Sequence, residues 1–296
     1  MPRKLKPLIS VPLIGLALSI LAGCADSDHI SVSGSTTVLP AVSKAADSFH
    51  MDTGKVVIVN AGGSGGGFNQ LAEGQTDIGM MSRDITPEEK SQFPHIKFTP
   101  IAIGRDAVAP VVSSEIFDKG VNSLTLTEIA AIYRGDIDNW QEVGGPDKAI
   151  FVIDKESSSG TRQTFMKVVM GNSKATAKGA DLVIGSNNEE QTAIAQSDSA
   201  IGMLSHAWFN DDVKGISIEL NDGQLITPTL DMIRSGRFPI TRDLNIIIRD
   251  DVTPGAQEFV DYLLSERGQS FVSASGYIAV KSVSYTHLTL PTNREV

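Results

Sequence analysis

The chain has 296 residues, of which 41% are hydrophobic and 20% charged, an ordinary balance for a globular protein with one large or two mid-sized domains. Its formal net charge of −10 argues against a nucleic-acid-binding protein, because such proteins usually carry a basic face. Any anion site must therefore be built locally, against the field of the whole molecule.

The first 23 residues are typical of a lipoprotein signal peptide. Three basic residues within the first six are followed by an apolar stretch over residues 7–22, shorter than the ~20 apolar residues of a comfortable membrane span. Residues 21–24, Leu-Ala-Gly-Cys, resemble the lipobox in which a cysteine thiol is lipidated. We expect Cys24, the only cysteine, to anchor the protein to a membrane of the cell envelope, facing the periplasm or the outside, with residues 24–29 as a tether. The alternatives are an ordinary secretory signal with an incidental cysteine, or an uncleaved anchor.

Strand and helix patterns then alternate along the chain. The predicted strands are residues 30–33, 55–59, 76–81, 97–103, 107–112, 150–153, 199–204 and 244–248. The predicted helices are residues 38–51, 68–73, 126–133, 162–170 and 254–264, with one more beginning at residue 86. The run 55–59 is β-branched and is expected to be buried, and residues 61–67 are expected to form a glycine loop. This alternation predicts an α/β fold with mostly parallel sheets. Residues 282–296 break the pattern and read as a frayed or non-native tail.

Loops with similar chemistry stand between predicted strands and helices. They are residues 34–37 (Gly-Ser-Thr-Thr), 62–67 (Gly-Gly-Ser-Gly-Gly-Gly) and 157–161 (Ser-Ser-Ser-Gly-Thr), and residues 81–84 (Met-Ser-Arg-Asp) add a hydroxyl and a guanidinium. Hydroxyls and free N–H groups at helix N-termini favour an anion. Each loop alone could be a helix cap or a linker. Because loops at the carboxyl ends of strands gather at one edge of an open sheet, the four together predict a site for a small tetrahedral oxyanion.

Competing motifs are weaker. The chain has neither a P-loop nor the dinucleotide-binding glycine pattern, and its five scattered histidines lack metal-ligand spacing, so we expect no cofactor and no metal. Residues 62–66 do fit the G-x-S-x-G pattern of hydrolases, with Ser64 as nucleophile. That function needs a histidine, and His206 is the one well downstream, apart from His287 in the tail. A Ser64 hydrolase therefore remains an alternative.

The order of motifs identifies a family resemblance over roughly residues 30–281. The motifs are residues 33–40, 63–66, 77–83, 124–133, 139–140, 143–145, 159–162 and 268–277. In this order they resemble the periplasmic phosphate-binding proteins of bacterial ABC importers, the PstS-like family. The resemblance implies a two-lobed periplasmic-binding-protein fold of type II-like form, with a hinge of crossing strands. Lobe one would take residues 30–104 and 245–281, and lobe two residues 105–244. It also implies a monomer that is not an enzyme, captures inorganic phosphate and delivers it to an ABC permease.

The resemblance also implies a set of phosphate-binding positions. They are Thr36, the backbone of Thr37, Ser64, Ser82, Ser159, Gly160 and Thr161, with Ser35, Arg83, Lys155 and Arg162 as further candidates. Ser82 stands where enterobacterial members carry an aspartate, which accepts a hydrogen bond from protonated phosphate and repels sulfate. Lys155 stands where the family usually has arginine, and lysine cannot form a bidentate fork. Arg83 or Arg162 could supply the guanidinium instead, or could serve in salt bridges. Another oxyanion, sulfate or molybdate, therefore stays open as the ligand.

Overall fold

The computed structural model describes residues 29–280. The predicted signal segment, Cys24, nearly all of the predicted tether and the tail 282–296 lie outside the described residues. Within residues 29–280, no helix has both the length and the apolar character needed to cross a membrane.

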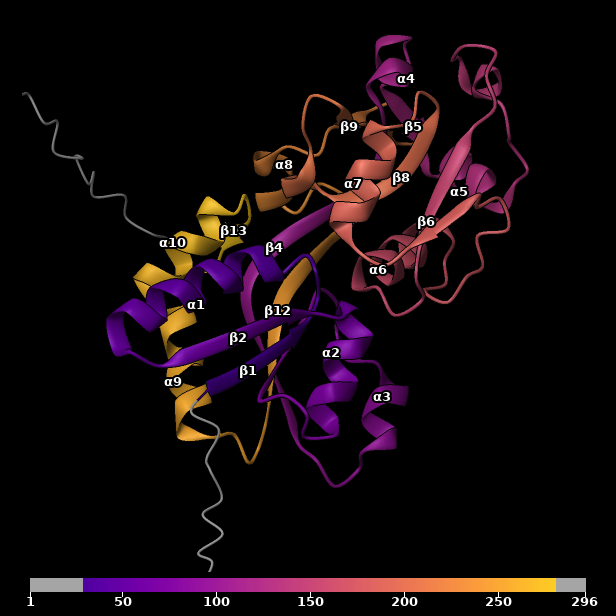
Figure 1. Cartoon of the computed structure of the whole chain (residues 1–296). Coiled ribbons are helices and arrows are strands. Elements are labelled where there is room, and N and C mark those ends of the chain that lie inside the picture. Colours follow the sequence, from indigo (N-terminus) through magenta and orange to yellow (C-terminus); the bar gives the residue numbers. More distant parts are fainter. Residues whose placement is uncertain (1–28, 281–296) are drawn as a thin grey trace, which may run out of the picture.

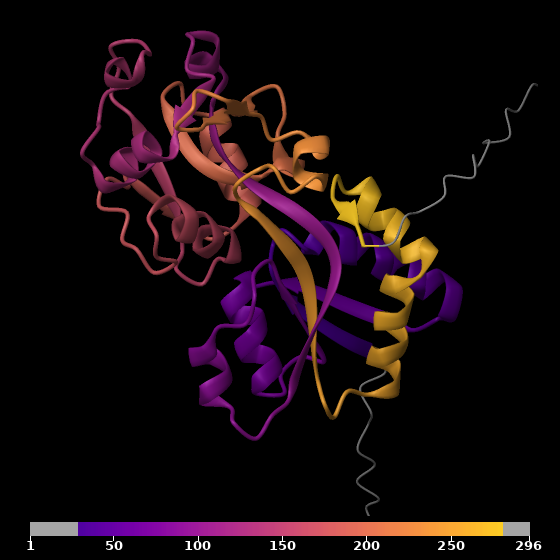
Figure 2. The ribbon, with the colours of Figure 1, turned by 180° about the vertical axis from the view of Figure 1, so that it is seen from behind.

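Two lobes are joined by two long antiparallel strands, β4 (Phe98–Ser113) and β12 (Thr241–Arg249), which run side by side from one lobe into the other (Figures 1 and 2). They are central in a sheet with the order β2-β1-β3-β12-β4-β8-β6-β7. The ladder between β4 and β12 shifts register between Leu244 and Asn245. The two lobes and the hinge of crossing strands that the family resemblance implies are thus present. The predicted lobe boundaries fall within these strands and stay a prediction.

The first lobe combines the N-terminal part of the chain with the C-terminal helices. Its strands are β1 (His29–Gly34), β2 (Val56–Ala61), β3 (Ile78–Met81) and β13 (Ile278–Ala279). Its helices are α1 (Leu39–Thr53), α2 (Gly63–Ala72), α3 (Pro87–Gln92), α9 (Pro254–Leu264) and α10 (Glu266–Ala274). Its core includes Phe49, which packs edge-on against Phe259 with ring centroids 5.2 Å apart.

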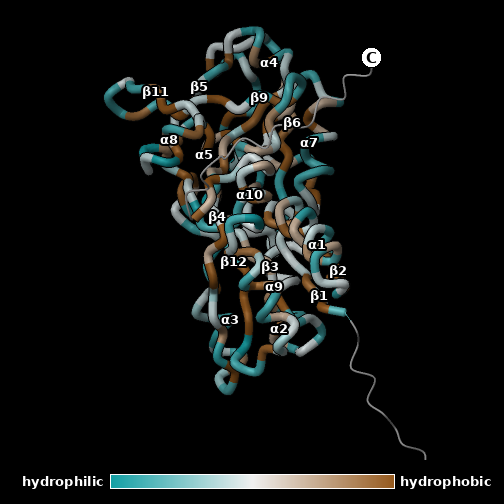
Figure 3. The backbone as a smooth tube through the Cα atoms, turned by 90° about the vertical axis from the view of Figure 1, so that its left-hand side faces the viewer, coloured by the Kyte–Doolittle hydropathy of each residue, from teal (hydrophilic) through white to brown (hydrophobic). Residues whose placement is uncertain are grey.

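The second lobe is a continuous segment between the crossing strands. Its strands are β5 (Ser123–Thr125), β6 (Phe151–Lys155), β7 (Leu182–Ile184), β8 (Ala200–Ser205), β9 (Val213–Gly215), β10 (Ser217–Glu219) and β11 (Leu225–Ile226). Its helices are α4 (Ser114–Asp118), α5 (Leu126–Arg134), α6 (Gly160–Val169), α7 (Asn187–Ala195) and α8 (Leu230–Arg234), with 3-10 turns η1 (Trp140–Val143) and η2 (His206–Trp208). Its core is separate, and includes Trp140, whose indole N–H donates to the Ser199 carbonyl over 2.9 Å. Figure 3 shows hydrophobic residues concentrated along the strands and hydrophilic ones on peripheral loops, such as the loop beside β11.

Several local predictions were wrong for physical reasons. Residues 97–103 and 107–112 belong to one strand, because β4 continues from one lobe into the other. Residues 56–59 of the predicted buried run lie in edge strand β2, which is largely exposed rather than buried. The glycine loop already turns into helix α2 at Gly63. The sheet is mixed rather than mostly parallel, since β12 and β4 run antiparallel to each other and to their neighbours β3 and β8.

Candidate functional site

Hydroxyl side chains from the two lobes meet beside the crossing strands. Thr37 Oγ1 and Thr161 Oγ1 are 3.2 Å apart, although they are 124 positions apart in the sequence. Ser64 Oγ lies 3.3 Å from Ser82 Oγ and accepts from the Ser82 backbone N–H over 3.1 Å. A Cβ on Gly160 would come within 2.2 Å of Ser64 Oγ and 2.6 Å of Ser82 Oγ, so a side chain there would force the lobes to shift. These five predicted positions are therefore brought together.

The other predicted hydroxyls lie beside this cluster in supporting roles. Ser35 Oγ accepts from the Thr37 backbone N–H over 3.2 Å. Ser159 Oγ caps helix α6 by accepting from the Arg162 backbone N–H over 3.3 Å. Thr36 Oγ1 accepts from the Asn187 backbone N–H over 3.4 Å. The Ser35 and Ser159 hydroxyls thus fix the backbone of the loops that carry the cluster.

Four helices begin around this cluster of hydroxyls. Helix α1 follows the Thr36–Thr37 loop, helix α2 contains Ser64 in its first turn, and helix α6 begins at Gly160. Helix α7, which the sequence analysis did not predict, begins at Asn187. The unpaired N–H groups and the positive dipole ends of these helices all favour a negative ligand.

The side chain of Arg242, on β12, is a site residue that the sequence analysis missed. Its Nη1 donates to Thr161 Oγ1 over 3.0 Å, and its Nη2 donates to Thr37 Oγ1 over 3.3 Å. Arg242 is buried, with 7% of its surface exposed. No motif surrounds it in the sequence, so no local signal marks it as a site residue. It brings a guanidinium to the hydroxyls of both lobes.

Asp106, on β4, holds Arg242 in place. Asp106 Oδ2 accepts from Arg242 Nε over 2.9 Å and from Nη2 over 2.6 Å. Its Oδ1 accepts from Ser205 Oγ over 2.7 Å and contacts His206 Nδ1 at 2.8 Å. Burial alone would raise the pKa of this carboxyl, but the Arg242 guanidinium and the bonds from His206 and Ser205 outweigh burial and hold the pKa below its ordinary value. Asp106 therefore stays charged and fixes the guanidinium.

Two of the predicted cations are used in salt bridges elsewhere. Arg83 Nη2 lies 2.6 Å from Glu89 Oε1, and Arg83 Nη1 lies 2.8 Å from Glu89 Oε2. Arg162 grips Asp154 through Nε and Nη2, the latter at 2.9 Å from Oδ2. The salt-bridge alternative is confirmed for both arginines, and Arg242 takes the place in which one of them was expected.

Lys155 is also engaged away from the hydroxyl cluster. Its Nζ lies 2.5 Å from Glu190 Oε2 and donates to the Ser186 carbonyl over 3.1 Å. Both side chains of this pair are almost fully buried. Burial raises the pKa of Glu190, and the neighbouring Lys155 charge counters part of that rise. The lysine thus neutralises a buried carboxyl inside lobe two.

The contacts of Ser64 differ from those of a hydrolase nucleophile. Its side-chain hydrogen bonds go to Ser82, whereas His206 Nε2 donates to the Gly276 carbonyl over 2.8 Å and its Nδ1 contacts Asp106. A serine nucleophile needs a base within hydrogen-bond reach.

Residues 29–280 also contain no group of three or more side chains that could hold a metal ion.

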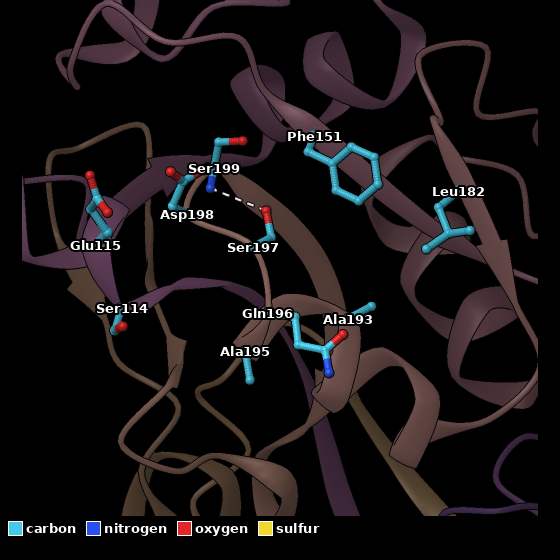
Figure 4. A pocket seen from close by; sticks show the side chains of 10 residues that line it. All are labelled: Ser114, Glu115, Phe151, Leu182, Ala193, Ala195, Gln196, Ser197, Asp198 and Ser199. Atoms are coloured by element: carbon cyan, nitrogen blue, oxygen red, sulfur yellow. Dashed lines mark hydrogen bonds between the residues drawn. The ribbon is translucent and has the colours of Figure 1, made fainter.

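Among the hollows in the surface of residues 29–280, two bear on the choice of site. One, of about 1050 Å³, is a groove between the lobes whose lining includes Arg242, Arg105, Lys167 and Lys174. Arg83 also lines this groove, and Arg242 contacts the hydroxyl cluster, but the hydroxyl residues of the cluster do not line the groove. The other, of about 840 Å³, lies in lobe two and is lined by residues such as Phe151 and Asp198 (Figure 4). None of the predicted binding residues lines the second hollow, so the hydroxyl cluster beside the groove between the lobes is the candidate site.

Comparisons with known proteins agree with this architecture. The family model described as PBP superfamily domain matches residues 22–267. The phosphate-binding protein PstS of Bacillus subtilis is 34% identical over 263 residues, which are 88% of this chain and 83% of that protein. The phosphate-binding protein PstS of Borreliella burgdorferi is 29% identical over 90% of this chain and 96% of its own length. The chain belongs to the PstS family of the PBP superfamily.

Solved structures place the same fold in phosphate transport systems. A structure described as a phosphate ABC transporter substrate-binding protein with bound phosphate, from Clostridium perfringens, has a TM-score of 0.76 and 30% identity. It aligns over 86% of this chain and 100% of its own. An ABC-type phosphate transport receptor from Vibrio cholerae has a TM-score of 0.68 and 30% identity, over 84% and 99% of the two chains. The family resemblance expected from the motifs is confirmed.

Proposed function

We propose that this protein captures inorganic phosphate outside the cytoplasm and delivers it to an ABC permease. The observation that carries the proposal is the meeting of Thr37 from lobe one, Thr161 from lobe two and the guanidinium of Arg242. The names of the PstS relatives and of the phosphate-bound structural neighbour support the same ligand. Their roles in binding and transport also argue that this protein is not an enzyme.

The orientation of the hydroxyls supports an anion. Thr37 Oγ1 receives hydrogen bonds from Asn187 Nδ2 over 2.9 Å and from Arg242 Nη2, and both of these nitrogens can only donate. Both lone pairs of Thr37 Oγ1 are therefore occupied, so its hydrogen points to Thr161 Oγ1 in this structure and could turn to an anion bound there. Ser64 is polarised in the same way by the Ser82 backbone N–H. The proposed ligand set consists of Thr36, Thr37, Ser64, Ser82, Ser159, Gly160, Thr161 and Arg242.

An acidic protein can hold an anion in this way because the donors are local and desolvated. Electrostatic interactions are stronger in the low dielectric of a buried site than in water. Asp106 offsets part of the Arg242 charge, so most of the binding would come from neutral hydroxyl and backbone donors. A ligand that touches both lobes stabilises their closed arrangement and would present that arrangement to the permease.

We further propose that the protein acts as a monomer attached to the membrane through a lipid on Cys24, with residues 24–29 as its tether. The small residues before Cys24 and the positive segment ahead of them support this anchor. Mass spectrometry of the mature N-terminus is the test. An unmodified Cys24 in protein isolated from its native membrane would rule the anchor out.

Isothermal titration calorimetry of the mature protein, stripped of bound ligand, tests the ligand. We expect tight, metal-independent binding of phosphate that persists in the presence of a chelator. Sulfate and molybdate should bind more weakly and should be displaced by phosphate. Heat with sulfate or molybdate but none with phosphate would contradict the proposal in favour of another oxyanion.

A further inference from the structure

The side chain of Asn187, the first residue of α7, sits against the proposed ligand set. It is 1% exposed, and its Nδ2 donates to Thr37 Oγ1 over 2.9 Å. Its backbone N–H donates to Thr36 Oγ1 over 3.4 Å. The side chain is therefore held against Thr37, and the backbone of Asn187 against Thr36 of the same loop of lobe one.

The carbonyl oxygen of the same amide is left without a protein partner. Within residues 29–280, Asn187 Oδ1 is one of four buried side-chain polar atoms that accept or donate no hydrogen bond. Leaving a buried acceptor unsatisfied destabilises a fold, so such an atom at a ligand site points to a partner that the ligand supplies. An amide oxygen can only accept, so that partner must carry a hydrogen.

The other groups around the proposed ligand mainly donate hydrogen bonds, whereas Asn187 Oδ1 accepts one. Arg242 and the backbone N–H groups can only donate. Both lone pairs of Thr37 Oγ1 and one lone pair of Ser64 Oγ already accept from such obligate donors. Ser82 Oγ contacts the Ser64 hydroxyl, and a hydroxyl can turn to donate or to accept. Ser82 can therefore adapt to an anion with or without a hydrogen, whereas Asn187 Oδ1 cannot.

We propose that Asn187 Oδ1 accepts the hydrogen of protonated phosphate and thereby sets the selectivity of the site against fully ionised oxyanions. Phosphate near neutral pH carries a hydrogen and sulfate carries none. With sulfate in the site, Asn187 Oδ1 would stay unpaired and would face an anionic oxygen. A site built to pair with a ligand hydrogen rejects an analogue that lacks it. This inference rests on the proposed phosphate function.

The test is the ratio of the sulfate Kd to the phosphate Kd, measured by calorimetric competition in three variants. Asn187→Leu removes the acceptor while keeping the same branched side-chain skeleton, and Asn187→Asp keeps an acceptor but loses the Nδ2 donor. Asn188→Leu is the matched control, since Asn188 is the next residue of the same helix and is exposed. We expect the ratio to fall about tenfold in Asn187→Leu, the equivalent of one hydrogen bond. It should stay at or above the wild-type value in Asn187→Asp, even as both affinities drop, and should not change in Asn188→Leu.

Two results would overturn the inference. Equal weakening of phosphate and sulfate in Asn187→Leu would mean that Asn187 only orients the Thr37 hydroxyl. A fallen ratio in Asn187→Asp would exclude an acceptor role, and this variant answers the question even if Asn187→Leu does not fold. A wild-type protein that binds no phosphate would instead contradict the proposed function, whatever affinities the variants show.

Discussion

Two buried arginines, one at the hinge and one within lobe two, have nearly the same environment but different uses. Arg242 and Arg162 each grip a buried aspartate, Asp106 and Asp154, with donor–acceptor distances of 2.6–3.0 Å. The remaining hydrogen bond of Arg162 goes to the Ala175 carbonyl, a backbone group of its own lobe. Arg242 instead directs donors to a hydroxyl of each lobe. The direction of the donors not used by the carboxylate, rather than the charge, distinguishes a ligand-facing arginine from a structural one.

The location of each pair explains the difference. Arg242 and Asp106 are directly opposite in the ladder between β12 and β4, so the pair links the two crossing strands. Arg162 is in the first turn of α6 and Asp154 is in β6, so that pair fastens a helix to a strand of the same lobe. A guanidinium at the crossing can reach both lobes, whereas one inside a lobe cannot.

The largest expected effect comes from replacing each arginine with methionine. Arg242→Met should weaken phosphate binding about a hundredfold or more, because at least two charge-assisted donors of about 1.5 kcal/mol each are lost. Arg162→Met should change the phosphate Kd less than about threefold. Both variants should lose about 3–5 kcal/mol of unfolding free energy, because each strands a buried carboxylate. Calorimetry measures the phosphate Kd, and denaturant unfolding measures the free energy of unfolding. Equal losses of phosphate affinity in the two variants would contradict a ligand-binding role that belongs to Arg242 alone.

A second expected effect concerns the pH dependence of stability. The pKa of Asp106 is held below its ordinary value of 3.8 in the folded protein. Its contribution is therefore complete above pH 3.8 and is lost as the pH falls through the lower folded value. Asp106→Asn should be less stable than wild type by about 3–5 kcal/mol at pH 7.

Denaturant unfolding between pH 7 and pH 2 checks this linkage. The gap between wild type and Asp106→Asn should hold above pH 3.8 and narrow below it. Asp243→Asn is the control, because the Arg105–Asp243 pair is about half exposed and should contribute at most about 1 kcal/mol. A gap that opens rather than closes as the pH falls would mean that the pKa of Asp106 is raised.

The smallest effect should come from lysine substitutions at the same two positions. Lysine keeps the charge but cannot serve two acceptors in one plane as the guanidinium fork does. Arg242→Lys should weaken phosphate binding about tenfold, since one directed hydrogen bond is lost while the charge remains. Arg162→Lys should stay within about twofold of wild type. A larger loss in Arg162→Lys than in Arg242→Lys, measured by calorimetry, would reverse the assignment of the two arginines.

Local signals in the sequence predicted the half of the site that is made of loops. Glycine and hydroxyl runs such as residues 62–67 mark strand-to-helix turns wherever they occur, so Ser64 and Thr161 could be predicted from neighbours in sequence. Arg242 and Asn187 could not, since their roles depend on contacts with residues 150–205 positions away. The α/β fold class was predictable because strand and helix patterns are also local signals. The continuity of β4 through residues 104–106 was not predictable, because it depends on pairing with β12.

The pairing of Asp106 and Arg242 also has a mechanical consequence. Two lobes that turn about a pair of strands move least at those strands and most at their far ends. A ligand held at the crossing strands therefore lies close to the axis about which the two lobes rotate. A change of less than an ångström in the lengths of these hydrogen bonds would be amplified at the outer surfaces of both lobes, where a membrane partner could detect whether the site is filled.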